Sequence, residues 1–279
     1  MRNLKLSNGY EIPQMGIGVF MIKDHEECKQ SVLNALKIGY RHIDTAQVYK
    51  NEKAVGEAIK ESRIPREDIF LTTKLWPTNF GYDKAKKAIQ NSLDALQVDY
   101  IDLMLLHRPY EDYIGAWKTM EEEVGEGKIR SIGISNFNIS RVQKILDVAK
   151  IKPVVNQVEC HPYEQQKELR TFLEKNDILM EAWYPLGHGN KKLLSNPVIT
   201  ELAKKYGKSN VQIILHWHIQ IGNIVFPKSS NPEHIRSNFA IFDFELSKED
   251  MAKIASIDKR KPYFNIPEWV QKIMLNFSS

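Results

Sequence analysis

The stretch IFLTTKLWPTNFGYDKAKKAIQNSLDALQVDYIDLMLLH (69–107) holds the unit from which the fold can be predicted. It begins and ends in the apolar runs IFLTTKL (69–75) and IDLMLLH (101–107), which are typical of strands buried on both faces. Between them, YDKAKKAIQNSLDALQ (82–97) carries apolar residues at helical spacing after the loop PTNFG (77–81). This order of strand, helix and strand predicts a parallel βαβ unit.

Similar apolar runs recur along the chain, and most of them start about 22 to 32 residues apart, which leaves room for one crossover helix. The longer last interval contains two helical patterns, NPVITELAKKYG and SNVQIILHWHIQ. Eight alternations of strand and helix predict an α/β fold, a single (β/α)₈ TIM barrel over residues 1–279. The eight runs are GIGVF (16–20), RHIDTA (41–46), IFLTTKL (69–75), IDLMLLH (101–107), SIGISN (131–136), PVVNQVE (153–159), DILMEAWY (177–184) and NIVFPK (223–228).

An N-terminal β-hairpin is predicted ahead of the barrel. LKLSNGYEI (4–12) has two short alternating runs joined at Asn8-Gly9, a dipeptide that favours a tight hairpin turn. We expect this hairpin to close the bottom of the barrel.

Composition excludes several classes of protein. Apolar residues make up 42% of the chain and charged residues 27%, which is ordinary for a globular protein with a sizeable core. No apolar stretch approaches about 18 residues, and the start lacks the apolar segment of a secretory signal. We therefore expect a cytoplasmic protein with no membrane partner.

The charges and cysteines argue against nucleic-acid and metal binding. The net charge is +4, but lysines alternate with acidic residues in helical stretches such as EKAVGEAIKE (52–61), which is typical of a solvated helix face. Cys28 and Cys160 are far apart and belong to no C-x-x-C motif. We expect no nucleic-acid partner, no disulfide and no metal site.

Ionisable residues stand at the ends of three consecutive predicted strands. Asp44, Lys74 and His107 occupy these ends, and Tyr49 follows in the loop after Asp44. Catalytic groups of such barrels lie at the carboxyl ends of the strands. Alone, each residue is compatible with capping, packing or a place on the barrel rim; together they favour a site, because a buried lysine needs a counter-charge that Asp44 can supply.

This combination predicts acid catalysis by Tyr49. A free tyrosine has a pKa of about 10 and is a poor proton donor at neutral pH. A lysine cation about 4 Å away stabilises the phenolate by about 4 kcal/mol at an effective dielectric constant near 20, before the cost of burial. Lys74 would therefore make Tyr49 more acidic, Asp44 would hold Lys74, and His107 would bind a carbonyl oxygen and share in the proton relay.

Carbonyl reduction also requires a hydride, which only a cofactor supplies. The glycine fingerprint of a dinucleotide-binding Rossmann domain is missing, since GIG (16–18) lacks the third glycine. Barrels instead bind phosphate near strands seven and eight, where the chain reads FPKSSNPEHIRSNF (226–239). Lys228 and Ser229 precede a helix start with Ser230 or Asn231 as N-cap, which predicts a cationic site with free backbone N–H groups. A capped helix start without a ligand is the alternative.

Six motifs in this order resemble the signatures of the aldo-keto reductase superfamily, in particular its bacterial diketogluconate reductase-like branch. They are DTAQVYKNEKAVGEAI (44–59), LTTKLW (71–76), VDYIDLMLLHRP (98–109), GKIRSIGISNF (127–137), VVNQVECHPY (154–163) and PKSSNPE (227–233). The resemblance implies a catalytic tetrad of Asp44, Tyr49, Lys74 and His107, with Tyr49 as the proton donor.

The resemblance also implies how a nicotinamide cofactor binds. Ser135, Asn136 and Gln157 would hold the carboxamide, and Trp183 would stack on the nicotinamide ring. Leu186 and Gly187 would follow the pyrophosphate. The 2′-phosphate of NADPH would be bound by Lys228, Ser229 and Ser230, and the adenine would lie near Asn238.

Three residues depart from the family pattern. Arg108 stands where a tryptophan is common, which adds a cation near the pocket; pointing to solvent is the alternative for this side chain. His234 replaces an arginine that contacts the 2′-phosphate, so NADH is a possible cofactor beside NADPH. Tyr184 replaces a serine and would alter the cover of the pyrophosphate. The chain ends soon after EWVQKIM (268–274), which predicts a shallow, open pocket.

These observations predict an NADP(H)-dependent reductase of small aldehydes or ketones, monomeric or weakly oligomeric, that transfers hydride from C4 of the nicotinamide. We expect Phe20, Trp76, His107 and Arg108 to surround the substrate. Two other functions stay open: a non-catalytic, cofactor-sensing subunit, and an aldolase that forms a Schiff base on Lys74, which pairing with Asp44 disfavours.

Overall fold

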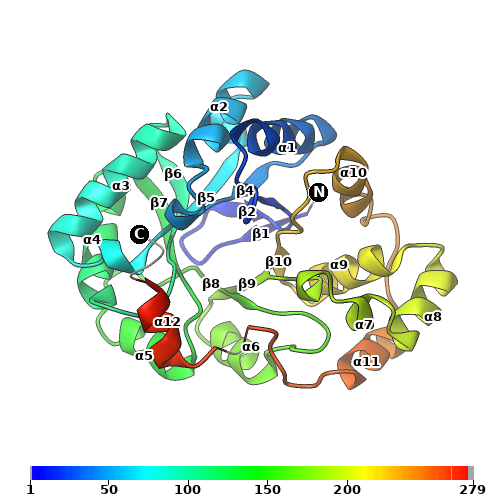
Figure 1. Ribbon diagram of the computed structural model, residues 1–279. Coiled ribbons are helices and arrows are strands. Elements are labelled where there is room, and N and C mark those ends of the chain that lie inside the picture. The colour runs from blue at the N-terminus through cyan, green and yellow to red at the C-terminus, as the bar shows by residue number, and fades with distance from the viewer. Residues whose placement is uncertain (1, 265, 276–279) are drawn as a thin grey trace.

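The computed structural model describes residues 2–264 and 266–275 and has a (β/α)₈ barrel at its centre (Figure 1). Within this part of the chain, eight parallel strands neighbour one another in sequence order. Parallel bridges from Met15 to Val225 and from Gly18 to Lys228 join the last strand to the first. The strands are β3 (Ile17–Gly18), β4 (His42–Asp44), β5 (Phe70–Leu75), β6 (Ile101–Leu106), β7 (Ile129–Ser135), β8 (Val155–Glu159), β9 (Leu179–Trp183) and β10 (Ile224–Val225). The predicted barrel is confirmed, with a strand in each predicted run.

Helices surround the strands (Figure 1). Their ends follow local signals: the Asp24 side chain accepts from the Glu27 N–H at the start of α1, and Gly39 ends this helix at a φ of 121°. The helices are α1 (His25–Ile38), α2 (Glu52–Ser62), α3 (Tyr82–Leu96), α4 (Tyr113–Gly125), α5 (Ile139–Leu146), α6 (Lys167–Glu174), α7 (Lys191–Leu194), α8 (Pro197–Tyr206), α9 (Asn210–Gln220), α10 (Pro232–Phe239), α11 (Lys248–Ser256) and α12 (Glu268–Leu275).

The predicted hairpin is also confirmed. Strands β1 (Asn3–Lys5) and β2 (Glu11–Pro13) pair antiparallel. Leu6 and Ile12 are buried in one cluster with residues from the starts of barrel strands, such as Phe70 of β5 and Val155 of β8. The hairpin therefore closes the end of the barrel at which the strands begin.

Alternation along the strands fills the barrel interior in layers. Phe70 packs beside the hairpin, so Thr72 and Lys74, two and four residues further along β5, point the same way. The same alternation places the side chains of Leu179, Glu181 and Trp183 of β9 on one face. The apolar layer near the hairpin thus gives way to charged and polar side chains toward the carboxyl ends of the strands.

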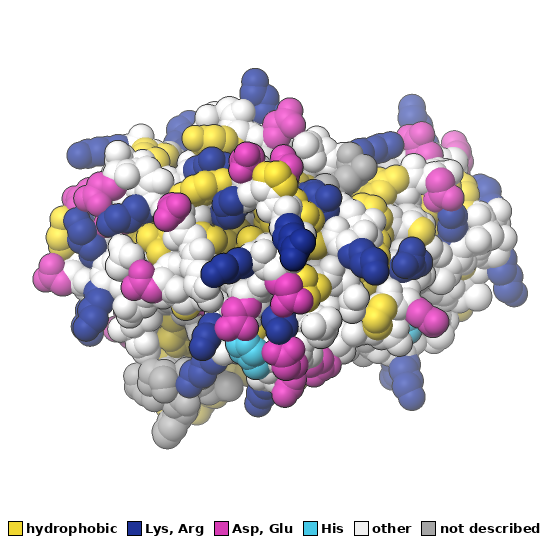
Figure 2. All heavy atoms as spheres, turned by 90° about the horizontal axis from the view of Figure 1, so that it is seen from above, with side chains coloured by type: hydrophobic (Ala, Val, Ile, Leu, Met, Phe, Trp, Pro, Cys, Tyr) yellow, Lys and Arg dark blue, Asp and Glu magenta, His cyan; other side chains and the backbone are white. Residues whose placement is uncertain are grey.

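The surface carries both signs of charge. Figure 2 shows lysine and arginine side chains interspersed with aspartate and glutamate on one face. Within the described residues, no helix combines the length and the apolar character needed to cross a membrane.

Candidate active site

Lys74 and Asp44 form an ion pair inside the barrel at the carboxyl ends of β5 and β4. The Lys74 Nζ lies 2.7 Å from each Asp44 carboxylate oxygen and 2.9 Å from the Thr45 carbonyl oxygen. Burial disfavours the lysine cation, but the combined effect of Asp44, Tyr49 and Glu181 outweighs burial, and the pKa of Lys74 is raised above its ordinary value. Asp44 therefore holds Lys74 in place and favours its charged form.

Tyr49 ends the short helical turn η1 (Gln47–Tyr49), in the loop that follows β4. Its hydroxyl lies 3.5 Å from the Lys74 Nζ. Asn51 anchors this loop, because its Nδ2 donates to the carbonyl oxygens of Val19 and Ile22 and its Oδ1 accepts from Thr45. The loop geometry thus brings the phenol to the ion pair.

The net direction of the Tyr49 pKa differs from the expected one. Burial raises the pKa of Tyr49, Lys74 lowers it, and the carboxylate of Asp44 raises it again; the sum lies above the ordinary value. Two features limit the influence of Lys74: its charge is shared with Asp44, and its distance of 3.5 Å is at the limit of a hydrogen bond. Tyr49 is therefore favoured in its protonated form at neutral pH.

His107 follows β6 and is neutral at physiological pH. Burial, with Lys74 and Arg108 nearby, holds its pKa well below the usual 6.5. Its ring centroid lies 5.9 Å from that of Tyr49 and 5.0 Å from the Trp76 ring. Among the groups that the structure describes, the buried Nδ1 has no hydrogen-bond partner. A neutral imidazole beside Tyr49 can donate one N–H to a substrate oxygen.

The four residues predicted to hold the nicotinamide are brought together. Asn136 links them, since its Nδ2 donates to the Ser135 hydroxyl at 2.9 Å and its Oδ1 accepts from the Trp183 indole N–H at 2.9 Å. The Ser135 hydroxyl donates to the Gln157 carbonyl oxygen at 3.0 Å. Trp183 is half-buried, so part of its ring is open for stacking.

The predicted phosphate site lies on the loop from β10 to α10. Lys228 and His234 are exposed, Ser229 and Ser230 are half-buried, and Asn238 is buried. Asn231, rather than Ser230, is the N-cap, and its side chain accepts from the backbone N–H groups of Glu233 and His234. The predicted free N–H groups are thus already partnered at these two positions, which leaves side chains such as Lys228 as the anion ligands.

The C-terminal segment packs against Glu159 at the carboxyl end of β8. The backbone N–H groups of Tyr263 and Phe264 donate to the buried carboxylate of Glu159, at 2.6 and 3.0 Å. Gly187 is buried with no room for a larger side chain, because an added Cβ would lie 2.6 Å from the Tyr263 ring. Leu186 and Tyr184, the other residues predicted near the pyrophosphate, are half-buried in the same loop.

The predicted substrate residues form a largely aromatic wall. The Phe20 ring lies 5.0 Å from Tyr49 and 6.3 Å from Tyr184, between centroids. Trp76 lies on the other side of the site against His107. Arg108 donates from Nη1 to the Gln271 side chain of α12 at 2.9 Å, so it does not simply point to solvent.

Sequence reasoning missed Glu181, Glu159 and Gln271. Glu181 is fully buried, and its Oε2 accepts from the Gln157 Nε2 at 3.0 Å; the same nitrogen donates to Asp44 at 2.9 Å. Burial, followed by the Asp44 carboxylate, raises the pKa of Glu181 to about 8. The sequence signal that could have identified Glu181 was an acidic residue in an apolar strand. It stands two positions before Trp183, which places both side chains on the inward face.

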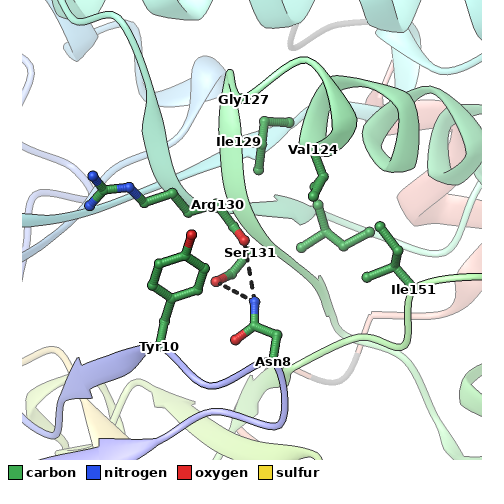
Figure 3. A pocket seen from close by; sticks show the side chains of 9 residues that line it. Asn8, Tyr10, Val124, Gly127, Ile129, Arg130, Ser131 and Ile151 are labelled. Atoms are coloured by element: carbon green, nitrogen blue, oxygen red, sulfur yellow. Dashed lines mark hydrogen bonds between the residues drawn. The ribbon is translucent and has the colours of Figure 1, made fainter.

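Cavities at the other end of the barrel do not form part of this site. One of about 390 Å³ lies between the hairpin and the start of β7 (Figure 3). Several of its polar groups are partnered: Asn8 donates to the Arg130 carbonyl and the Ser131 hydroxyl, and Arg130 pairs with Asp102 at 3.1 Å. These partners indicate a structural role for the cavity lining.

Known proteins resemble this chain in both sequence and fold. Glyoxal reductase of Bacillus subtilis (strain 168) is 48% identical over 257 residues, covering 92% of each chain. Methylglyoxal reductase DkgA of Escherichia coli (strain K12) is 43% identical over 261 residues, covering 92% of this chain and 94% of that protein. A crystal structure of an aldo/keto reductase from Brucella melitensis matches with a TM-score of 0.89 and 46% identity, over 92% of this chain and 99% of that one. Residues 14–259 also match the model of the aldo/keto reductase family, so the chain belongs to this family.

Proposed function

We propose that this protein reduces small aldehydes or ketones to alcohols with NADP(H), and that Tyr49 donates the proton to the carbonyl oxygen. One observation carries the proposal: the Tyr49 hydroxyl lies 3.5 Å from a lysine that is itself bound at 2.7 Å by both oxygens of a buried aspartate. The family and its relatives with reductase names support the same chemistry.

The residues present fit a nicotinamide cofactor. Both amide hydrogens of Gln157 are directed at the carboxyl groups of Asp44 and Glu181, which leaves its Oε1 to accept from a carboxamide. Trp183 offers a partly exposed ring, and Lys228 an exposed cation for a phosphate. The cofactor would supply the hydride that reaches the carbonyl carbon.

The chain's own residues would handle the proton. As negative charge develops on the substrate oxygen, Tyr49 transfers its proton there, and Lys74 stabilises the phenolate that remains. His107 is neutral and donates an N–H to the same oxygen, which orients the carbonyl beside Tyr49. Asp44 keeps Lys74 charged and in place, so the positive potential is present before the substrate arrives.

Lys74 is a poor candidate for a Schiff-base nucleophile. A Schiff base requires a neutral amine, whereas the Asp44 pairing raises the pKa of Lys74. Borohydride treatment with an aldehyde should therefore leave no substrate mass on Lys74, as measured by peptide mass spectrometry.

The proposal is tested by following NADPH absorbance with purified protein and a panel that includes glyoxal, methylglyoxal and 4-nitrobenzaldehyde. We expect aldehyde-dependent oxidation of NADPH and formation of the alcohol. Binding of NADPH without oxidation by any member of the panel would instead support the cofactor-sensing alternative and contradict the reductase proposal.

A further inference from the structure

Arg108 is a largely buried cation whose partners are neutral. Its Nη1 donates to the side-chain carbonyl of Gln271 at 2.9 Å, and its guanidinium carbon lies 4.9 Å from the centre of the Phe264 ring. Within the described part of the chain, no other hydrogen bond is formed by this guanidinium, although it has five N–H donors. Burial lowers the pKa of Arg108, and the groups that act against burial are tyrosines.

The other charges of the site do not compensate Arg108. Lys74 is matched by Asp44, and His107 is neutral because its pKa is held well below 6.5. Glu181 shares the amide of Gln157 with Asp44, deep in the barrel, and its raised pKa of about 8 favours the neutral acid at pH 7. Glu159, the other carboxylate at this end of the barrel, accepts from the backbone N–H groups of Tyr263 and Phe264. Among the described side chains, no carboxylate therefore forms an ion pair with Arg108.

Arg108 is also placed to meet a substrate. It follows His107 directly, and the Phe264 ring that its guanidinium contacts lies 6.1 Å from the ring of Trp183, between centroids. A carbonyl held between His107 and Tyr49 would therefore lie in the same barrel mouth as this guanidinium. A guanidinium fork with free N–H groups matches the two oxygens of a carboxylate.

We propose that Arg108 forms a carboxylate subsite, so that the preferred substrates are carbonyl compounds that carry a carboxylate at a distance from the reacting carbon. This inference rests on the proposed reductase function and narrows its substrate class. The Gln271 side chain holds the guanidinium in position from α12, and the Phe264 ring supports its face.

The test compares two aldehydes of the same shape, 4-carboxybenzaldehyde and 4-formylbenzamide, with saturating NADPH. The measured quantity is the ratio of kcat/KM for the acid to kcat/KM for the amide. Because Arg108 also acts on Tyr49, its removal alters proton donation to both aldehydes alike, and the ratio isolates recognition of the carboxylate.

We expect the ratio to fall at least about tenfold in Arg108→Gln, since a charge-assisted hydrogen bond is lost, and to be partly retained in Arg108→Lys. Gln271→Glu provides a second variant that keeps the arginine but gives it an internal carboxylate, and the ratio should fall there too. Arg260→Gln is the matched control: its side chain is 78% exposed, and its loss should leave the ratio unchanged.

A ratio that stays the same in Arg108→Gln and in Gln271→Glu, with both aldehydes still reduced, would overturn the carboxylate subsite and leave the reductase function standing. If the wild-type protein reduces neither aldehyde nor any member of the panel above, the proposed function itself fails. The two failures are thus distinguishable.

Discussion

The Nζ of Lys74 lies 2.7 Å from each of the two carboxylate oxygens of Asp44, and less than a tenth of either side chain is exposed. Removal of one partner leaves the other as an uncompensated buried charge, which costs about 3–5 kcal/mol in comparable pairs. We expect Asp44→Asn and Lys74→Met each to lower the free energy of unfolding by an amount of that order, measured by urea denaturation. The double variant should recover part of the loss; fully additive losses would contradict a coupled pair.

The raised pKa of Glu181 predicts a stability that falls as pH rises from about 4.5 to about 8. Its pKa is about 8 in the folded protein against an ordinary value of 4.5, so between these values the unfolded chain has lost a proton that the folded chain retains. Stability from this group is therefore complete below about pH 4.5 and falls by about 1.4 kcal/mol per pH unit up to about pH 8.

In Glu181→Gln this contribution disappears, and the variant should gain stability over the wild type as pH rises from 5 to 8. The measurement is chemical denaturation at each pH. Glu168→Gln, at a side chain that is 81% exposed, is the control that should follow the wild type. Parallel curves for wild type and Glu181→Gln would show that Glu181 is already ionised at pH 5.

We expect Asn51 to affect turnover although its side chain does not contact the reacting atoms. Its side chain ties the Tyr49 loop to the carbonyl oxygens of Val19 and Ile22 at 3.0 and 3.2 Å. In Asn51→Ala we expect kcat to fall about tenfold or more, because the phenol is no longer held beside Lys74, with little change in the Kd for NADPH. Equal losses in kcat and in cofactor affinity would point instead to general disruption of the barrel.

With a histidine at position 234, we expect only a modest preference for NADPH over NADH. His234 is exposed on the first turn of α10, the helix that follows Lys228 in the chain. His234→Arg places a permanent cation there and should raise the ratio of kcat/KM for NADPH to that for NADH by about tenfold. Arg236→Lys on the same helix serves as a control that should not alter the ratio. An unchanged ratio in His234→Arg would separate this residue from the 2′-phosphate.

The strand pattern was sufficient to predict the barrel and the residues at its mouth. Asp44, Lys74 and His107 each end an apolar run, and the topology of a parallel barrel brings consecutive strand ends together. Local sequence could not decide between Ser230 and Asn231 as the cap of α10, since both side chains suit that position.

Contacts between distant segments were beyond sequence reasoning. Gln271 reaches Arg108 across 163 residues, and the backbone of Tyr263 reaches Glu159 across 104, with no motif that links either pair. The direction of the Tyr49 pKa was wrong for a related reason: the attraction of Lys74 could be calculated from an assumed distance, but the opposing burial depends on the packed structure.

Proton donation by Tyr49 is the central claim, and the Tyr49→Phe variant tests it most directly. The measurement pairs kcat for an aldehyde with the Kd for NADPH from quenching of tryptophan fluorescence. We predict that kcat falls at least about 100-fold while the Kd changes by less than about threefold, because the variant loses only the acid. A kcat within about threefold of the wild-type value would contradict the account.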